Sequence, residues 1–170
     1  MVKQFNRNNE DLKRFALELL RNLRKDKWPV FLCVGSDKFV CDSLAPIVAE
    51  ILRKKYNINA YVYGGLDYNI NANNLMEAVN YIETEHPRST LILIDATLGD
   101  EVGQIRLSNG SFAGLGRRLP IKKVGQLSIL GVVGKRTKNF DLNSTRLRLV
   151  TDLAQFISKG CAMAVWKLYA

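Results

Sequence analysis

The chain has 170 residues and a net charge of +9, a length that fits one domain with a hydrophobic core of its own. Hydrophobic residues make up 47% and charged residues 24%, as in ordinary globular proteins. No apolar run approaches the roughly 20 residues of a membrane span, and the start, MVKQFNRNNEDLKRF, has no signal-peptide core. We therefore expect a cytoplasmic protein without a membrane partner.

The first third of the chain predicts a helix, a buried strand and a second helix. Apolar residues at helical spacing predict a helix over 8–26, within an N-terminal helical extension (1–28) that packs on the core. The continuous apolar run 30–34, VFLCV, is typical of a strand buried on both faces. A helix is predicted over roughly 43–56, with Pro46 in its first turn, where the missing N–H costs little.

The middle of the chain predicts two more strands around a third helix. A short strand at 60–63 ends at two glycines, and a helix follows over roughly 73–85. The segment 90–96, TLILIDA, is the second strongly buried strand. Weak alternation over 102–107 predicts an edge strand.

The last third predicts a long loop, a buried strand and a final helix. Residues 111–125, rich in glycine and basic residues, are expected to form the loop, and 127–133 the strand. The helix is predicted to begin near Asn143 and Ser144 and to run toward Ala170, with a break at Gly160. Helices alternate with buried strands, so we expect a single α/β domain over 1–170 with helices on both faces of the sheet.

Acidic residues follow or end two of the predicted strands. Parallel strands place their carboxyl ends at one edge of a sheet, where ligands bind. If 30–34 and 90–96 are neighbours, Asp42 and Asp95 face one crevice, and Asp67 borders it. Other interpretations are a helix cap for Asp42 and a loop-stabilising role for Asp67. Asp95 is harder to explain structurally, because an acid in an apolar strand is desolvated unless it is paired.

The basic residues are concentrated in one part of the chain. Between Gly103 and Arg148 there are ten Lys or Arg and one acid, Asp141. A basic segment of this kind indicates an acidic partner. Nucleic acid is a less favoured partner, because no recognisable module or set of interleaved aromatic residues accompanies the charges. A basic surface without a specific partner is the other interpretation.

The cysteines and the histidine do not indicate a metal or a cofactor. Cys33, Cys41 and Cys161 are odd in number and form no C-x-x-C pair. This pattern argues against a disulfide framework and against a zinc site. The sole histidine, His86, precedes the strand at 90–96, at the opposite end from Asp95. We therefore predict no cofactor and no tightly bound transition metal.

Short motifs from about Pro29 to Gly160 resemble a known family in their order and spacing. They are Asp42-Ser43-Leu44 with Pro46, Leu66-Asp67, Asn74-Leu75, Ile94-Asp95-Ala96, Leu98-Gly99, Val102-Gly103, Ala113-Gly114 with Gly116, Leu119-Pro120, Val124-Gly125 and Thr145-Arg146-Leu147. Together they resemble the YyaC family of sporulation proteins, described as spore proteases. More distantly, they resemble the superfamily of germination proteases and hydrogenase maturation proteases. The resemblance implies a three-layer α/β/α sandwich, phosphorylase/hydrolase-like, around a mostly parallel, mixed five-stranded sheet.

The resemblance also implies an activity. It indicates a peptidase of the forespore or mother cell in which Asp42 and Asp95 act as a catalytic pair. Candidate residues for binding the peptide substrate are Asp67, Gly114, Gly116, Arg117 and Arg118. Hydrogenase maturation proteases recognise nickel through an acid at the Asp42 position and a histidine, and this chain has no histidine at a matching place.

Two alternatives to a peptidase remain open. Cys41 and Ala45 stand where relatives usually have glycine, which favours a catalytically inactive binding or regulatory protein that keeps the fold. A metal-dependent hydrolase would use Asp42, Asp67 and Asp95 as oxygen ligands for magnesium, calcium or manganese.

Overall fold

The structure is a computed structural model that describes residues 1–110 and 124–170. Its strands are β1 (Val2–Phe5), β2 (Val30–Cys33), β3 (Tyr61–Tyr63), β4 (Leu91–Gly99), β5 (Ile105–Asn109) and β6 (Leu127–Lys135). Its helices are α1 (Asn9–Leu20), the 3₁₀ turn η1 (Val40–Asp42), α2 (Leu44–Glu50), its π-helical continuation η2 (Ile51–Tyr56), α3 (Leu75–Glu85) and α4 (Leu147–Tyr169). None of the helices in these ranges has the length and apolar content that crossing a bilayer requires.

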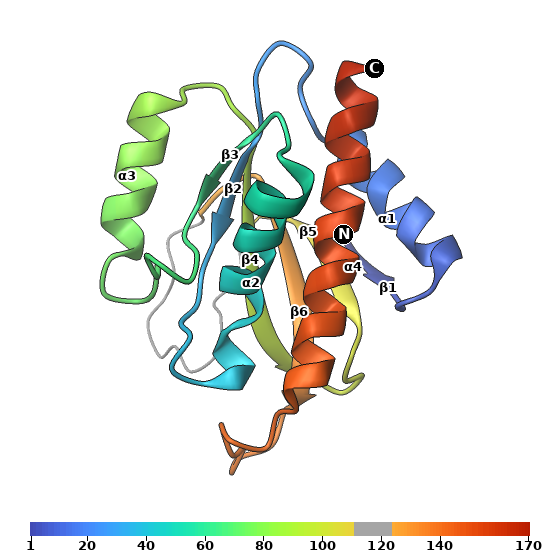
Figure 1. Ribbon diagram of the computed structural model, residues 1–170, viewed down its shortest axis with the longest axis vertical. Coiled ribbons are helices and arrows are strands. Elements are labelled where there is room, and N and C mark those ends of the chain that lie inside the picture. Colours follow the sequence, from blue (N-terminus) through green and yellow to red (C-terminus); the bar gives the residue numbers. More distant parts are fainter. Residues whose placement is uncertain (111–123) are drawn as a thin grey trace.

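The strands form one sheet in the order β1-β5-β6-β4-β2-β3 (Figure 1). Strands β3, β2, β4 and β6 are parallel, whereas β5 runs antiparallel to both β6 and β1. The predicted mixed, mostly parallel sheet is confirmed, but it has six strands rather than five. The sixth is β1, from the segment predicted as a helical extension. Because β1 pairs with β5, the strand predicted at the edge lies inside the sheet.

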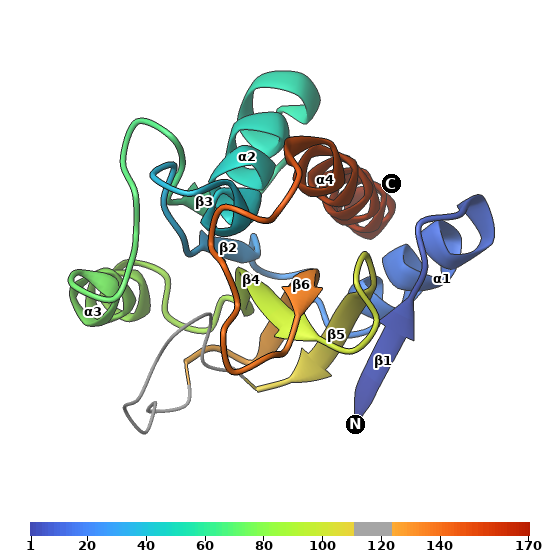
Figure 2. The ribbon, with the colours of Figure 1, turned by 90° about the horizontal axis from the view of Figure 1, so that it is seen from below.

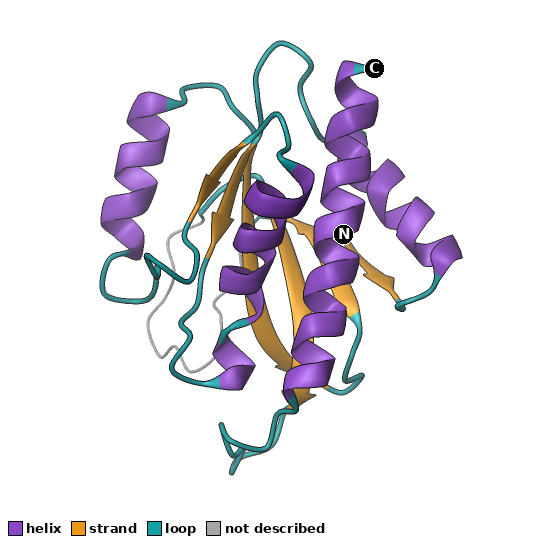
Figure 3. Cartoon of the chain, in the orientation of Figure 1, coloured by secondary structure: helices purple, strands orange, loops and turns teal. Residues whose placement is uncertain are grey.

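Helices cover both faces of the sheet, as Figures 2 and 3 show. Helices α1, α2 and α4 lie on one face and enclose the larger core, to which β4 contributes Ile92 and Ile94. Helix α3 lies on the other face over a smaller core, to which β4 contributes Leu91 and Leu93. The alternation of side chains along a strand divides the apolar run in this way. The predicted three-layer α/β/α arrangement is therefore confirmed.

Helix α4 runs without a break through Gly160, contrary to the predicted interruption. Gly160 faces Phe15 of α1, and a Cβ there would overlap the buried Phe15 ring. The glycine therefore permits close packing of two helices rather than ending one.

We expect Gly160→Val to lower the free energy of unfolding by about 1–3 kcal/mol through overpacking against Phe15. The measurement is chemical denaturation. Lys159→Val is the matched control, because Lys159 is exposed on the same helix and the β-branched residue is the same. Equal stabilities of the two variants would show that this contact is not tight.

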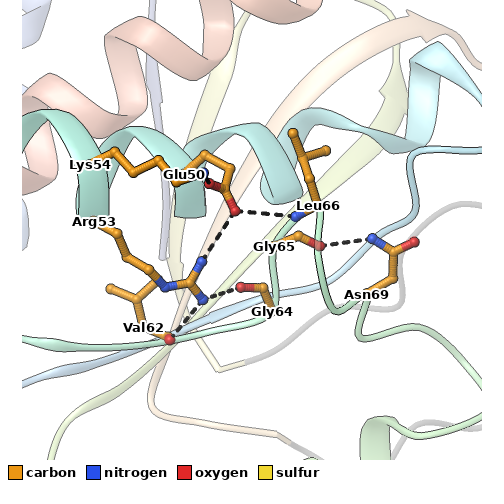
Figure 4. Close-up of polar contacts among 8 residues, drawn as sticks. All are labelled: Glu50, Arg53, Lys54, Val62, Gly64, Gly65, Leu66 and Asn69. Carbon is orange, nitrogen blue, oxygen red and sulfur yellow. Dashed lines mark hydrogen bonds and ion pairs between the residues drawn. The ribbon is translucent and has the colours of Figure 1, made fainter.

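Among the described residues, a side chain and not another strand forms hydrogen bonds with the outer edge of β3 (Figure 4). Arg53, in η2, donates through Nη2 to the carbonyl oxygens of Val62, at 3.0 Å, and Gly64. Glu50 holds the guanidinium in place, with 3.5 Å between Arg53 Nη1 and Glu50 Oε1. The basic last turn of this helical segment therefore satisfies main-chain acceptors that β2 does not reach.

Candidate functional site

Asp95 lies where β2 ends and β4 continues. Just past β2, Val34 N donates a main-chain hydrogen bond to Ile94 O of β4, at 2.9 Å. Strand β4 was expected to end at residue 96 but runs on to Gly99, because β6 continues beside it. Asp95 is therefore inside its strand, at the level where its neighbour stops. Its side chain is 3% exposed, and Oδ1 accepts a hydrogen bond from Ala96 N at 2.7 Å.

Asp42 reaches the same edge of the sheet from the next segment of the chain. It ends η1, which contacts β4. Its carbonyl oxygen accepts a hydrogen bond from Ser36 N at 3.0 Å, so the loop after β2 folds back on itself. Gly35 permits this turn with a φ of +152°. Asp42 is half-buried, and Ser43 occupies the position before α2.

The predicted adjacency of the strands at 30–34 and 90–96 is confirmed, because β2 pairs with β4; Asp95 lies in β4, and Asp42 lies in η1, after β2. By strand alternation, the Asp95 side chain lies on the α3 face, with Leu91 and Leu93. Asp42 precedes α2, which covers the opposite face. Asp42 and Asp95 therefore approach the end of β2 from opposite faces of the sheet.

A cavity of about 470 Å³ adjoins Asp42. In Figure 2, which looks onto the carboxyl ends of the parallel strands, the β6–α4 loop passes beside the β2–α2 loop. These loops and the end of β4 line the cavity with Phe39, Cys41, Asp42, Leu98, Thr137, Lys138, Phe140 and Leu142. Of these residues, the sequence interpretation singled out Asp42 as catalytic and Cys41 as a departure from the relatives beside it. The others come from three segments with no shared motif.

Cys41 is fully buried beside this cavity. Burial raises the pKa of its thiol, and the negative charges of Asp42 and Asp141 raise it further. The thiol therefore stays protonated at neutral pH, whereas a cysteine nucleophile reacts as the thiolate. This environment does not favour Cys41 as a nucleophile.

Asp67 lies in the loop after β3 and is exposed. Figure 4 shows how the start of this loop is held: Glu50 Oε1 accepts from Leu66 N at 3.4 Å, and Asn69 donates to Gly65 O at 2.8 Å. The hydrogen bond from Lys54 to Glu50 is the main cause that raises the pKa of Lys54, and Asp67 adds to it. Asp67 does not line the cavity beside Asp42.

The other predicted substrate-binding residues, Gly114, Gly116, Arg117 and Arg118, lie outside the described residues. Within residues 1–110 and 124–170, no group of three or more His, Cys, Asp or Glu side chains could hold a metal ion. The interpretation in which Asp42, Asp67 and Asp95 together bind a divalent cation is therefore wrong for the described arrangement.

His86 follows α3 and lies at the end of the sheet where β3 and β4 begin, opposite to the carboxyl ends of these strands. Its ring stacks on Tyr61 with centroids 3.8 Å apart, and Nε2 is 2.6 Å from the hydroxyl of Tyr63. Burial lowers the pKa of His86, and Glu85 opposes this shift. The folded state therefore favours the neutral imidazole.

From this shift we expect the protein to lose stability as pH falls below about 6.5, the ordinary pKa of histidine. The unfolded chain then binds a proton that the folded chain resists, and the loss is complete below the lowered folded pKa. Denaturation midpoints between about pH 5.5 and 7.5 measure this effect around that value. His86→Gln should flatten the profile; an unchanged slope in that variant would assign it to other groups.

Fold and site together define an α/β sandwich protein with one aspartate inside β4 and another in the segment that follows the adjacent parallel strand β2. The family described as "Protein of unknown function (DUF1256)" matches residues 3–160, and the chain belongs to this family. It is also similar to a Bacillus subtilis (strain 168) protein described as "Uncharacterized protein YyaC". The two are 32% identical over 158 residues, which are 89% of this chain and 77% of that protein. The predicted YyaC family is confirmed, and the relation to proteases stays a prediction.

Proposed function

We propose that this protein is a hydrolase that cleaves peptide bonds with Asp42 and Asp95 as an acid–base pair. One observation supports the proposal: β2 and β4 are adjacent parallel strands, and η1, which follows β2 at the carboxyl edge of the sheet and ends at Asp42, contacts β4, the strand that holds Asp95. Open α/β sheets bind ligands at this edge. An aspartate placed 3% exposed in an apolar strand also needs a reason, because burial of a charge costs stability.

The two environments favour different roles. Asp42 is half-buried and lines the cavity, so its carboxylate is the group that reaches water and substrate. As general base, it would take a proton from water while the water oxygen attacks the peptide carbonyl carbon. Asp95, more deeply buried, would hold the proton that passes to the leaving amine as the C–N bond breaks. The mechanism requires the two carboxylates to approach each other around the end of β2 closely enough to share one proton, because two close carboxylates do not both ionise.

The test is direct digestion. The purified chain is incubated with a defined peptide library, and new termini are identified by mass spectrometry. Expected products carry new amino termini that depend on the wild-type chain. The absence of cleavage in the library and in extracts of sporulating cells would contradict the proposal.

We infer the cellular setting from the resemblance to sporulation proteins. It supports the forespore or mother cell of a spore-forming bacterium as the place of action. A fluorescent fusion followed through sporulation tests this, and equal distribution in vegetative cells would contradict it.

A binding or regulatory protein without catalysis is the second candidate function. The observation that favours it is the exposure of Phe39 (40%) and Leu142 (41%) on the rim of the cavity. Large apolar side chains grouped at a surface mark interaction sites. Peptide binding without any cleavage would favour this candidate over the hydrolase.

A further inference from the structure

The cavity beside Asp42 has a chemical character that the two aspartates do not explain. Most of its lining is apolar, from Phe39 of the β2–α2 loop, Leu98 of β4, and Phe140 and Leu142 of the β6–α4 loop. Its volume, about 470 Å³, falls within the range of pockets that bind small ligands. The proposed hydrolysis needs water and carboxylates, and it does not need an apolar wall.

The apolar wall is built into the fold. Phe140 packs over Gly134 of β6 and reaches Leu98: a Cβ on Gly134 would overlap the Phe140 ring and lie 3.1 Å from Leu98 Cδ2. Facing this wall, Phe39 and Leu142 remain 40% and 41% exposed. Covering such side chains with an apolar group removes their surface from water, which favours binding.

One cationic side chain lines the cavity, and two more precede it closely in the chain. Lys138 lines it, and Lys135 and Arg136 precede it in the same exposed stretch. Arg136 is anchored there, since Nη2 donates to Leu98 O at 3.1 Å. These cations attract a carboxylate next to an apolar group, and repel a neighbouring cation.

We propose that this cavity is a specificity pocket that takes a leucine- or phenylalanine-sized side chain of a peptide, with an acidic residue beside it facing Lys138. The proposal rests on the proposed function for the position of the peptide, whose scissile bond would lie next to Asp42. The apolar lining residues Phe39, Leu98, Phe140 and Leu142 would select the side chain, and Lys138 would select the charge.

The experiment measures binding separately from cleavage. The full chain carrying Asp95→Asn is titrated by NMR with three capped peptides, Gly-Gly-Leu-Glu-Gly-Gly and its variants with serine for leucine or lysine for glutamate. The leucine peptide should bind roughly tenfold or more tightly than the serine peptide, from the burial of one leucine side chain. Lysine in place of glutamate should weaken binding severalfold at low salt and less at high salt.

Matched variants locate the site. Leu142→Ser should remove most of the preference for leucine over serine. Leu147→Ser should retain it, because Leu147 is 58% exposed but does not line the cavity. Lys138→Glu should reverse the preference between glutamate and lysine peptides.

The outcomes separate the two proposals. Selective binding without cleavage by the wild-type chain would contradict the proposed hydrolase and support the specificity pocket. Cleavage without a preference for leucine would contradict the specificity pocket and support the hydrolase. Cleavage with a preference that Leu142→Ser leaves intact would do the same. The absence of both binding and cleavage would overturn both.

Discussion

Replacement of Asp95 by asparagine is expected to abolish peptide hydrolysis while the fold stays intact. Asparagine has nearly the same shape, and its carbonyl oxygen can still accept from Ala96 N. It cannot ionise, so the proton transfer assigned to Asp95 is lost. General acid–base catalysis contributes roughly 10²- to 10⁴-fold, and a loss of kcat of this order is expected. Asp42→Asn should cause a loss of the same order.

Stability measurements distinguish lost chemistry from lost structure. Because burial of a carboxylate lowers the stability of the folded state, Asp95→Asn should leave the melting temperature unchanged or raise it. Asp26→Asn is the matched control, the same chemical change at an exposed position between α1 and β2, and it should retain full activity. Wild-type kcat in either Asp42→Asn or Asp95→Asn would contradict the paired mechanism.

Replacement of Gly35 by alanine is expected to destabilise the protein and displace Asp42. Gly35 has a φ of +152°, and an added methyl group would overlap the carbonyl oxygen of Asp42 and lie 3.1 Å from Pro46 Cδ. The backbone conformation costs roughly 1–3 kcal/mol for a non-glycine residue, and overpacking adds about 1–3 kcal/mol. Chemical denaturation should therefore show a loss of about 2–6 kcal/mol, the sum of these ranges.

Gly99→Ala is the control for this change. Gly99 has no positive φ, and the atom nearest to an added methyl group belongs to the flexible guanidinium end of Arg106. Its loss of stability should be smaller than that of Gly35→Ala. If Gly35→Ala retains both the stability and the activity of the wild-type chain, the loop holds Asp42 less tightly than its geometry indicates.

The central strands could be predicted because continuous apolar runs have few alternatives. The runs at 30–34, 90–96 and 127–133 correspond to β2, β4 and β6, which are buried on both faces. Strand β1 was missed because Val2–Phe5, VKQF, is short and half polar. Its stability comes from pairing with β5, about a hundred residues away, which local pattern does not reveal.

The candidate site was predictable only in part. The strands at 30–34 and 90–96 were predicted as possible neighbours, and β2 and β4 are adjacent and parallel. The topological rule for parallel strands did not show that β4 extends beyond the end of β2, so that Asp95 lies inside a strand. Nor could the pocket be found, because Phe39, Leu98 and Phe140 meet only after three separate segments converge. Exposed apolar residues in loops were the available signal, and it is weak without contacts.

The guanidinium of Arg53 has a consequence for how copies of this protein meet. An open strand edge is a template on which another chain can add a strand, the first step of many fibrous assemblies. Arg53 already occupies the outward-facing oxygens of Val62 and Gly64, and Glu50 keeps it there. A copy that adds a strand at β3 would first have to displace a bound cation. One ion-paired side chain therefore protects this edge against edge-to-edge aggregation at high protein concentration.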